Sequence, residues 1–215
     1  MRHGMKTRIL AAAASLAVLL GCGDDRHHGG GPPAPVTTVA FYDNFSGPFP
    51  GPNWDILAGD PFTSASEGND APSLILQPAG DPILVRSDFV FSTGQATTLA
   101  FDVASFEVQA STRFSFLIVF ASGGEIDASF DMFPFDDELV LTILGAEVVL
   151  AFPPSTVFDL IEFSVDVHGM ATWWINGDPA MSKGGFPADL YEIEFETVGG
   201  DFTVLALDNV LLTRP

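Results

Sequence analysis

The sequence predicts an all-β protein that folds as an antiparallel β-sandwich, and three observations support this fold class. About a dozen short segments rich in β-branched and aromatic residues are separated by Gly, Pro or Asp, as strands joined by tight turns would be. Several of these segments alternate apolar and polar side chains, which is typical of strands with one face in a core. Twenty phenylalanines supply that core, and helical periodicity is almost absent beyond residue 21.

The N-terminal segment, residues 1–21, is typical of a bacterial export signal. Three basic residues precede an apolar run over residues 9–20. That run is shorter than the roughly 20 apolar residues that a transmembrane helix needs. Residues 19–22, with the sequence LLGC, resemble the lipobox of bacterial lipoproteins, in which the signal peptide is cut before a cysteine that receives lipid. We therefore expect Cys22 to carry a lipid anchor in the membrane.

Cys22 is the only cysteine of the chain, which excludes an intramolecular disulfide and a thiolate metal cluster. An unpaired thiol is a liability in an oxidising compartment, and this favours lipidation over an ordinary secretory signal with an incidental cysteine. Gly23 stands where some lipoproteins of the inner membrane carry Asp, so we expect the outer membrane or the cell surface of a bacterial envelope. Residues 22–37 are rich in Gly and Pro and are predicted to form a flexible tether.

The remaining residues, 38–215, show no linker-like break and are predicted to form one β-sandwich domain. In segment 125–132, apolar residues at the even positions alternate with Glu, Asp and Ser at the odd positions, as expected for a strand at the surface of a sheet. Strands are predicted over residues 113–121, 125–132, 138–144, 147–152, 160–167 and 189–197.

The charge of the chain narrows the class of partner. Lys and Arg number 8 against 28 Asp and Glu, and three of the basic residues lie in the predicted signal peptide. A surface this acidic repels nucleic acid and anionic lipid headgroups, so we expect no nucleic-acid partner. Cations, basic proteins and neutral ligands such as sugars remain as candidate partners.

Four stretches resemble bacterial concanavalin A-like (LamG-like) jelly rolls: VAFYDNFSG (39–47), EGNDAPSLIL (67–76), FSVDVHGMATWWING (163–177) and TVLALDNVLLTR (203–214). The resemblance implies a jelly roll of the concanavalin A-like lectin and glucanase type, with a galactose-binding-like jelly roll as the alternative. It also implies a structural calcium between the first and last strands, for which Asp43 and Asp208 are candidate ligands because hard cations prefer carboxylate oxygens. A polar pair at a strand edge is the other interpretation of Asp208 and its neighbour Asn209.

Two adjacent tryptophans in the 163–177 stretch point to opposite faces if the segment is a strand. A two-residue turn at 168–169 would direct Trp174 into the core and Trp173 outward, beside Ser164 and Asp166. An aromatic ring with polar neighbours suits a sugar, whose C–H faces stack on rings while its hydroxyls form hydrogen bonds. A three-residue turn would exchange the two tryptophans. A loop that covers the outward ring is the competing interpretation.

Segment 123–131, GGEIDASFD, resembles the start of the carboxylate signature of concanavalin A-like β-glucanases. The resemblance implies that Glu125 is a nucleophile and that Asp127 assists it. The position of the acid/base is filled by Ser129 or Phe130, and Asp131 lies too far along an extended strand to replace it. A solvent-facing acidic strand explains the same residues.

The sequence therefore predicts a lipid-anchored extracytoplasmic protein that binds carbohydrate without catalysis, with Trp173, Ser164 and Asp166 as binding residues. A glycoside hydrolase-like jelly roll, degenerate or active, is the first alternative. A structural or assembly lipoprotein that contacts other envelope proteins is the second. No cofactor is expected beyond the structural calcium.

Overall fold

The computed structural model describes residues 37–215 except 65–71, 79–80, 107, 109–110 and 200–202. The chain separates into two compact units, Met1–Ala34 and Pro35–Pro215, and the first lies outside the described residues. In the second unit the described secondary structure consists of strands β1 to β16. None of the described segments is a helix able to span a membrane.

The first of two sheets, called sheet A here, contains eight antiparallel strands. The first and last strands of the domain meet in it, because β1 (Thr38–Asp43) pairs with β16 (Leu205–Arg214). The other strands follow in the order β14 (Asp178–Lys183), β13 (Ala171–Ile175), β12 (Asp159–Val165), β7 (Thr97–Ser105), then β16, β4 (Ser73–Leu76) and β3 (Phe62–Ser64).

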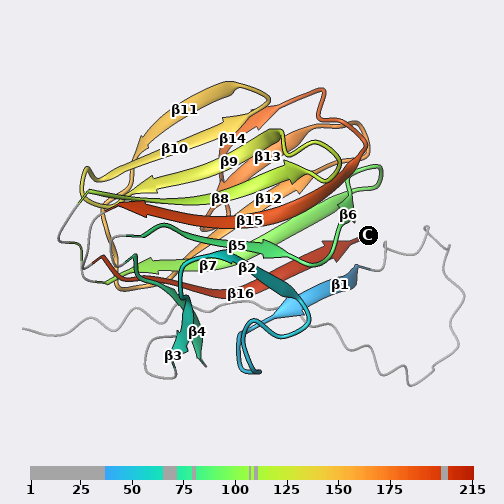
Figure 1. Cartoon of the computed structure of the whole chain (residues 1–215). Helices are drawn as coiled ribbons and strands as arrows, with labels where there is room; N and C mark the ends of the chain where they lie inside the picture. Colours follow the sequence, from blue (N-terminus) through green and yellow to red (C-terminus); the bar gives the residue numbers. More distant parts are fainter. Residues whose placement is uncertain (1–36, 65–71, 79–80, 107, 109–110, 200–202) are drawn as a thin grey trace, which may run out of the picture. The chain divides into compact units, whose positions relative to one another are not determined.

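The second sheet, sheet B, also has eight antiparallel strands and forms the other layer of the sandwich in Figure 1. Its order is β11 (Ala146–Ala151), β10 (Glu138–Ile143), β9 (Ile126–Phe133), β8 (Thr112–Phe120), β15 (Leu190–Gly199), β5 (Ile83–Ser87) and β2 (Trp54–Ala58), with β6 (Phe91–Ser92) beside β15. The predicted all-β antiparallel sandwich is therefore confirmed, and each of the six predicted strands is present within two residues of its predicted bounds.

The core lies between the two sheets and is built largely from aromatic rings. Along β8, Phe114 and Phe116 are buried between the sheets, while the intervening Ser115 lies on the outer face and donates its hydroxyl to Asp131. Phe116 stacks on Phe101 of β7 across the sandwich, with 4.2 Å between ring centroids. Burying each such ring stabilises the fold by roughly 1.5–3 kcal/mol.

Two buried tryptophans connect the sheets through their indole N–H groups. Trp54, in sheet B, donates its Nε1 to Oδ2 of Asp43 at the end of β1 in sheet A, at 2.9 Å. Trp173, in sheet A, donates its Nε1 to the carbonyl oxygen of Thr142 on β10 in sheet B, at 3.1 Å. Both rings are buried, so each indole N–H needs a protein acceptor, and each finds one on the opposite sheet.

A third link between the sheets lies at the β10–β11 turn. Leu144 has a φ of 47°, a left-handed conformation that is strained for a large side chain. Its carbonyl oxygen accepts a hydrogen bond from Nζ of Lys183 on β14 at 2.9 Å, and its N–H donates to the carbonyl oxygen of Asp127 at 2.7 Å. These two bonds hold the turn in place against the edge of sheet A.

We expect the Trp173→Phe variant to lose about 2–4 kcal/mol of unfolding free energy, because it lacks the hydrogen bond to Thr142 and leaves part of the ring volume empty. Urea denaturation followed by circular dichroism measures this loss. Trp174→Phe is the matched control, and it should cost about 1 kcal/mol or less because Trp174 is only half-buried. Equal losses in the two variants would contradict the assigned role of Trp173.

Candidate functional site

The hairpin between β12 and β13 turns over three residues, 167–169. The backbone N–H of Asp166 donates to the carbonyl oxygen of Met170 at 3.0 Å and closes the pair next to the turn. The Asp166 carboxylate accepts the backbone N–H groups of His168 and Met170, each at 2.8 Å, so an Asp side chain organises the turn. The predicted two-residue turn is therefore wrong, and the three-residue alternative is correct.

This turn shifts the hairpin register by one residue, so Phe163 pairs with Trp173 and Glu162 with Trp174. A shift of one residue moves every side chain to the other face of the strand. Trp173 is consequently in the core, with 0% of its surface exposed, and its prediction as the outward binding residue is wrong. Trp174 is the outward tryptophan, and Ser164 lies beside it as a polar neighbour, with its Oγ accepting the Trp174 indole N–H at 2.9 Å.

Asp166, a predicted binding residue, lines the hollow described below that also contains Ser164, and it has a structural role in the turn. Backbone hydrogen bonds from Met170 and His168 lower the pKa of its exposed carboxyl group, because they stabilise the ionised form. The oxygen that accepts both bonds is committed to the turn. Asp166 therefore positions the hairpin, and through the hairpin it positions Trp174.

The segment after the hairpin does not fold over the outward ring. Residues 178–183 form β14, which extends sheet A as its edge strand, and Pro179 pairs with Trp174 across it. The interpretation that a loop over this segment covers the ring is not supported. Trp174 stays half-buried on the outer face of sheet A.

A shallow hollow of about 320 Å³ lies against Trp174 on this outer face, and it is lined by Thr98, Glu162, Ser164, Trp174 and Gly177. Burial raises the pKa of the Glu162 carboxyl above its usual value of 4.5. The hollow thus combines an aromatic ring with hydroxyl and carboxyl groups, which can both donate and accept hydrogen bonds.

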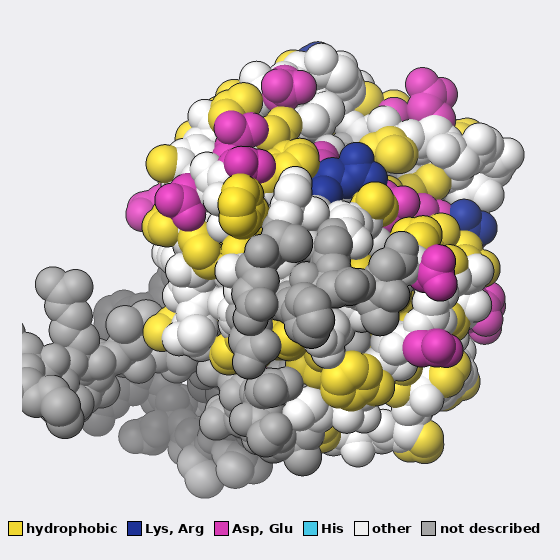
Figure 2. All heavy atoms as spheres, turned by 60° about the vertical axis from the view of Figure 1, so that its left-hand side comes forward, with side chains coloured by type: hydrophobic (Ala, Val, Ile, Leu, Met, Phe, Trp, Pro, Cys, Tyr) yellow, Lys and Arg dark blue, Asp and Glu magenta, His cyan; other side chains and the backbone are white. Residues whose placement is uncertain are grey.

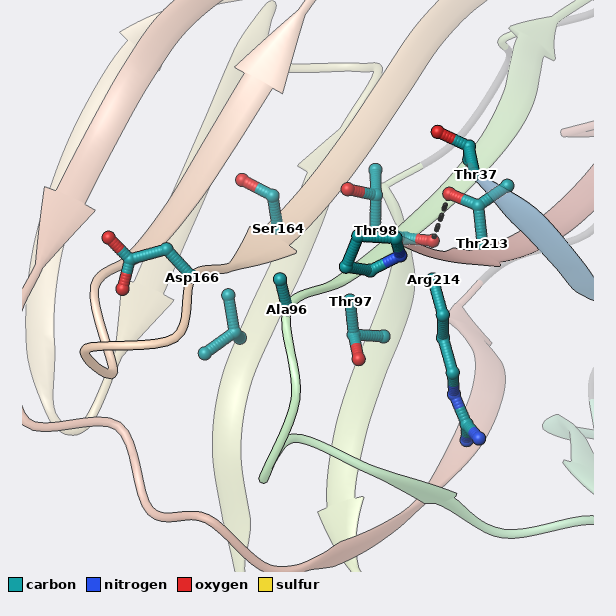
Figure 3. A pocket seen from close by; sticks show the side chains of 10 residues that line it. Thr37, Ala96, Thr97, Thr98, Ser164, Asp166, Thr213 and Arg214 are labelled. Carbon is teal, nitrogen blue, oxygen red and sulfur yellow. Dashed lines mark hydrogen bonds between the residues drawn. The ribbon is translucent and has the colours of Figure 1, made fainter. Parts of the chain in front are cut away.

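A second hollow of about 270 Å³ adjoins the first, because Thr98 and Ser164 line both. Figure 3 shows Ser164, Thr98 and Thr213 in one line across three neighbouring strands. The Thr213 hydroxyl donates to the Thr98 carbonyl oxygen at 3.4 Å. Together the two hollows form a surface that starts at Trp174 and runs across sheet A past the hydroxyl groups of Ser164, Thr98 and Thr213.

The predicted glucanase-like carboxylates lie elsewhere, on sheet B. Glu125 is exposed just before β9, and Asp127 accepts the phenol hydrogen of Tyr191 at 2.8 Å. Burial and the hydrogen bond to Asp127 raise the pKa of Tyr191 strongly.

Asp131, further along the strand, accepts hydrogen bonds from the hydroxyl groups of Ser115 and, at 2.6 Å, of Ser129. Asp127 of β9 therefore bonds to β15 across the intervening strand β8, and Asp131 bonds to β8 and to its own strand, so both carboxyl groups are engaged within sheet B.

Sequence reasoning missed an acidic ladder on β15. Glu192, Glu194 and Glu196 alternate along this strand and share the outer face of sheet B. Arg86 on β5 contacts the first two, with its Nε 2.6 Å from Glu194 and 3.6 Å from Glu192, and Arg113 on β8 binds Glu196 at 2.5 Å. The alternation in EIEFE is visible in the sequence, but the arginine partners come from distant strands. These ion pairs connect β15 to both of its neighbours. On the face drawn in Figure 2, Asp and Glu side chains are more numerous than Lys and Arg.

The carboxylate of Asp43, a predicted calcium ligand, is engaged in hydrogen bonds within the protein. It accepts three N–H groups, from the Phe45 backbone at 2.8 Å, the Trp54 indole at 2.9 Å and the Asn53 amide at 3.3 Å. A cation would compete with these donors for the same oxygen lone pairs. Asp208 is buried at a bulge in β16, where it accepts the Asn209 backbone N–H at 2.8 Å.

Within the described ranges, no group of three or more His, Cys, Asp and Glu side chains could hold a metal ion. The structure therefore gives no support to a structural calcium at Asp43 and Asp208. Cys22, the predicted lipidation site, lies outside the described residues.

Known proteins share the fold without close sequence similarity. No family model and no curated protein matches the sequence. Among solved structures, the globular domain of T. cruzi calreticulin is similar with a TM-score of 0.59 at 10% identity, covering 81% of this chain and 87% of that chain. The carbohydrate recognition domain of Emp47p has a TM-score of 0.60 at 13% identity, covering 76% of this chain and 89% of that chain. The apo Crh5 transglycosylase has a TM-score of 0.60 at 13% identity, covering 83% of each chain. These likenesses confirm the predicted jelly roll of the concanavalin A-like type.

The pKa of Glu162 predicts how its contribution to stability changes with pH. A raised pKa in the folded state means that folding favours the protonated form, so stability is lost as pH rises through the folded-state pKa. Glu162→Gln lacks this titration. We expect the unfolding free energy of the natural protein, relative to Glu162→Gln, to decrease as the pH rises above the ordinary glutamate pKa of 4.5. Urea denaturation at several pH values measures the difference, and a difference that rises with pH would contradict the burial of Glu162.

Proposed function

We propose that the protein is a lipid-anchored extracytoplasmic carbohydrate-binding protein, and that the sugar binds without catalysis on the outer face of sheet A. One observation carries this proposal. Trp174 is a half-buried aromatic ring on a sheet surface, and hydroxyl and carboxyl groups of Thr98, Glu162 and Ser164 surround it in the same hollow. A large ring on the surface is costly unless it packs against something, and a sugar face is a suitable partner.

The polar neighbours favour a sugar over a protein surface as the occupant. A protein interface centred on Trp174 would be expected to continue into an apolar patch. Instead, the residues next to it on β12 are Glu162 and Ser164, and the hollow continues toward Thr98. A sugar needs such an alternation of ring and hydrogen-bonding groups, because it has both C–H faces and hydroxyls.

Glycoside hydrolysis is the less supported candidate. A retaining mechanism requires two carboxyl groups about 5–5.5 Å apart, one of them free to exchange a proton. Asp127 is bound to Tyr191, and Asp131 is bound to Ser115 and Ser129. Both carboxyl groups thus accept hydrogen bonds within sheet B, and this favours the binding role over hydrolysis.

The lipid anchor and the location in the bacterial envelope are part of the proposal and rest on the sequence. The segment LLGC at residues 19–22 and the Gly- and Pro-rich residues 22–37 support a lipidated N-terminus followed by a tether. Such a tether would hold the sandwich outside the membrane with its sheet faces free to meet an extracellular glycan. The acidic composition supports neutral sugars over anionic ones.

We expect Trp174→Ala to abolish binding of neutral oligosaccharides, because the ring supplies the stacking surface. A glycan array screened with the full chain, in a detergent without a sugar headgroup, identifies binders, and isothermal titration calorimetry gives their affinities. Phe135→Ala is the matched control, since Phe135 is also an exposed aromatic residue (57%) but lies in the β9–β10 connection. Binding that survives Trp174→Ala, or is lost equally in the control, would refute the site.

We expect Cys22→Ser to remove the lipid and release the protein from membranes, because only the sulfur of Cys22 can carry the thioether-linked lipid. Mass spectrometry of the purified chain, together with partition between detergent and aqueous phases, measures this change. Ser15→Ala, a substitution within the predicted signal peptide, is the control that should leave lipidation intact. A natural protein that partitions into the aqueous phase would contradict the anchor.

A further inference from the structure

Trp174 stands at one end of a row of residues that crosses five strands of sheet A. Each neighbour in the row is a direct cross-strand partner of the next, so the side chains lie side by side on the outer face. The row consists of Trp174 on β13, Glu162 on β12, Ala100 on β7, Leu211 on β16 and Tyr42 on β1. It therefore has an aromatic side chain at each end.

Tyr42 is the more distant and the more exposed ring, with 51% of its surface accessible. Its neighbour Phe41 points inward and contacts Trp54, with 5.9 Å between ring centroids, which places Tyr42 on the outer face. The Tyr42 hydroxyl donates to Oδ1 of Asn209 at 2.8 Å. This bond fixes the outer end of the side chain and leaves the ring on the sheet surface.

A parallel row of hydroxyl groups lies two residues further along each strand. It contains one Ser or Thr on each of five adjacent strands: Ser182 on β14, Thr172 on β13, Ser164 on β12, Thr98 on β7 and Thr213 on β16. Three of these are the residues in line in Figure 3. In the described part of the chain, the Thr98 hydroxyl forms no hydrogen bond, and the Ser164 hydroxyl still has its own hydrogen to donate after accepting from Trp174.

We propose that Tyr42 forms a second aromatic subsite and that the ligand is an extended neutral oligosaccharide lying across the strands from Trp174 to Tyr42. The inference rests on the proposed function and specifies its ligand. Four inter-strand spacings of about 4.8 Å separate the two rings by roughly 19 Å, which exceeds a disaccharide and matches a longer chain. Stacking at both ends and hydroxyls along one side would bind such a chain along its length.

The middle of the row is suited to an oligosaccharide that lies flat on the sheet. Ala100 presents only a methyl group between Glu162 and Leu211, so the side chain at the middle of the row is short. Two hollows on this face share Thr98 and Ser164, and they follow the hydroxyl row toward Thr213. The formal charge of −20 opposes binding of an anionic polymer on the same surface.

Oligosaccharides of two different lengths distinguish the two subsites experimentally. The probes are neutral β-linked gluco-, manno- and galacto-oligosaccharides, each as a disaccharide and as a hexasaccharide, titrated calorimetrically into the full chain. Tyr42→Ala should weaken hexasaccharide binding by about tenfold and leave disaccharide binding unchanged, because only the longer ligand reaches Tyr42. Trp174→Ala should weaken both. Tyr42→Phe, which keeps the ring and loses the bond to Asn209, should retain most of the hexasaccharide affinity.

Phe62→Ala is the matched control, because Phe62 is an exposed aromatic residue (48%) on β3 of the same sheet but outside the row. If Tyr42→Ala behaves like Phe62→Ala while Trp174→Ala loses binding, the second subsite is refuted and the proposed function stands. If Tyr42→Ala weakens both ligand lengths equally, the subsite is refuted as well. If no probe binds the natural protein, both the proposed function and this inference fail.

Discussion

The two buried indoles of Trp54 and Trp173 set the constraint on which the rest of the sandwich depends. A buried indole N–H without an acceptor costs about 1–3 kcal/mol, so each ring can occupy the core only where the opposite sheet presents an oxygen. Trp54 finds Asp43 and Trp173 finds the carbonyl oxygen of Thr142, and these bonds lie in different regions of the sandwich. Hydrophobic contacts between sheets are tolerant of sliding, whereas these two directional bonds fix how the sheets face one another.

The choice of which tryptophan enters the core also decides what the outer face offers. Asp166 holds a three-residue turn, the turn sets the register, and the register sends Trp173 inward and Trp174 outward. Once Trp173 is held by Thr142, Trp174 has no alternative to the outer face of sheet A. The structural tryptophan and the candidate binding residue are therefore two consequences of one turn.

The sequence alone predicts the strands well and the site only in part, for physical reasons. Strand alternation is a local signal, which is why the segment at 125–132 is found within a residue of β9. The length of the turn before Trp173 is decided by the Asp166 side chain and by the distant acceptor at Thr142, and neither is readable from periodicity.

Other groups come together only after long-range strand pairing, as do the three donors around Asp43 and the arginines beside the β15 glutamates. Tyr42 could not be connected to Trp174 without the registers of four strand pairs.

The outer face of sheet A carries features that stability alone does not explain. Trp174 leaves part of a large ring exposed, and Glu162 beside it is a carboxyl group whose ionisation burial opposes, so a small neutral residue at either position would suit the sheet at least as well. The same holds for Tyr42, which projects from an edge strand rather than packing into the core. Local departures from the most stable choice tend to gather at functional sites. Here three of them fall on one cross-strand row, next to a row of hydroxyls, and this coincidence favours an extended ligand on the row over three unrelated surface substitutions.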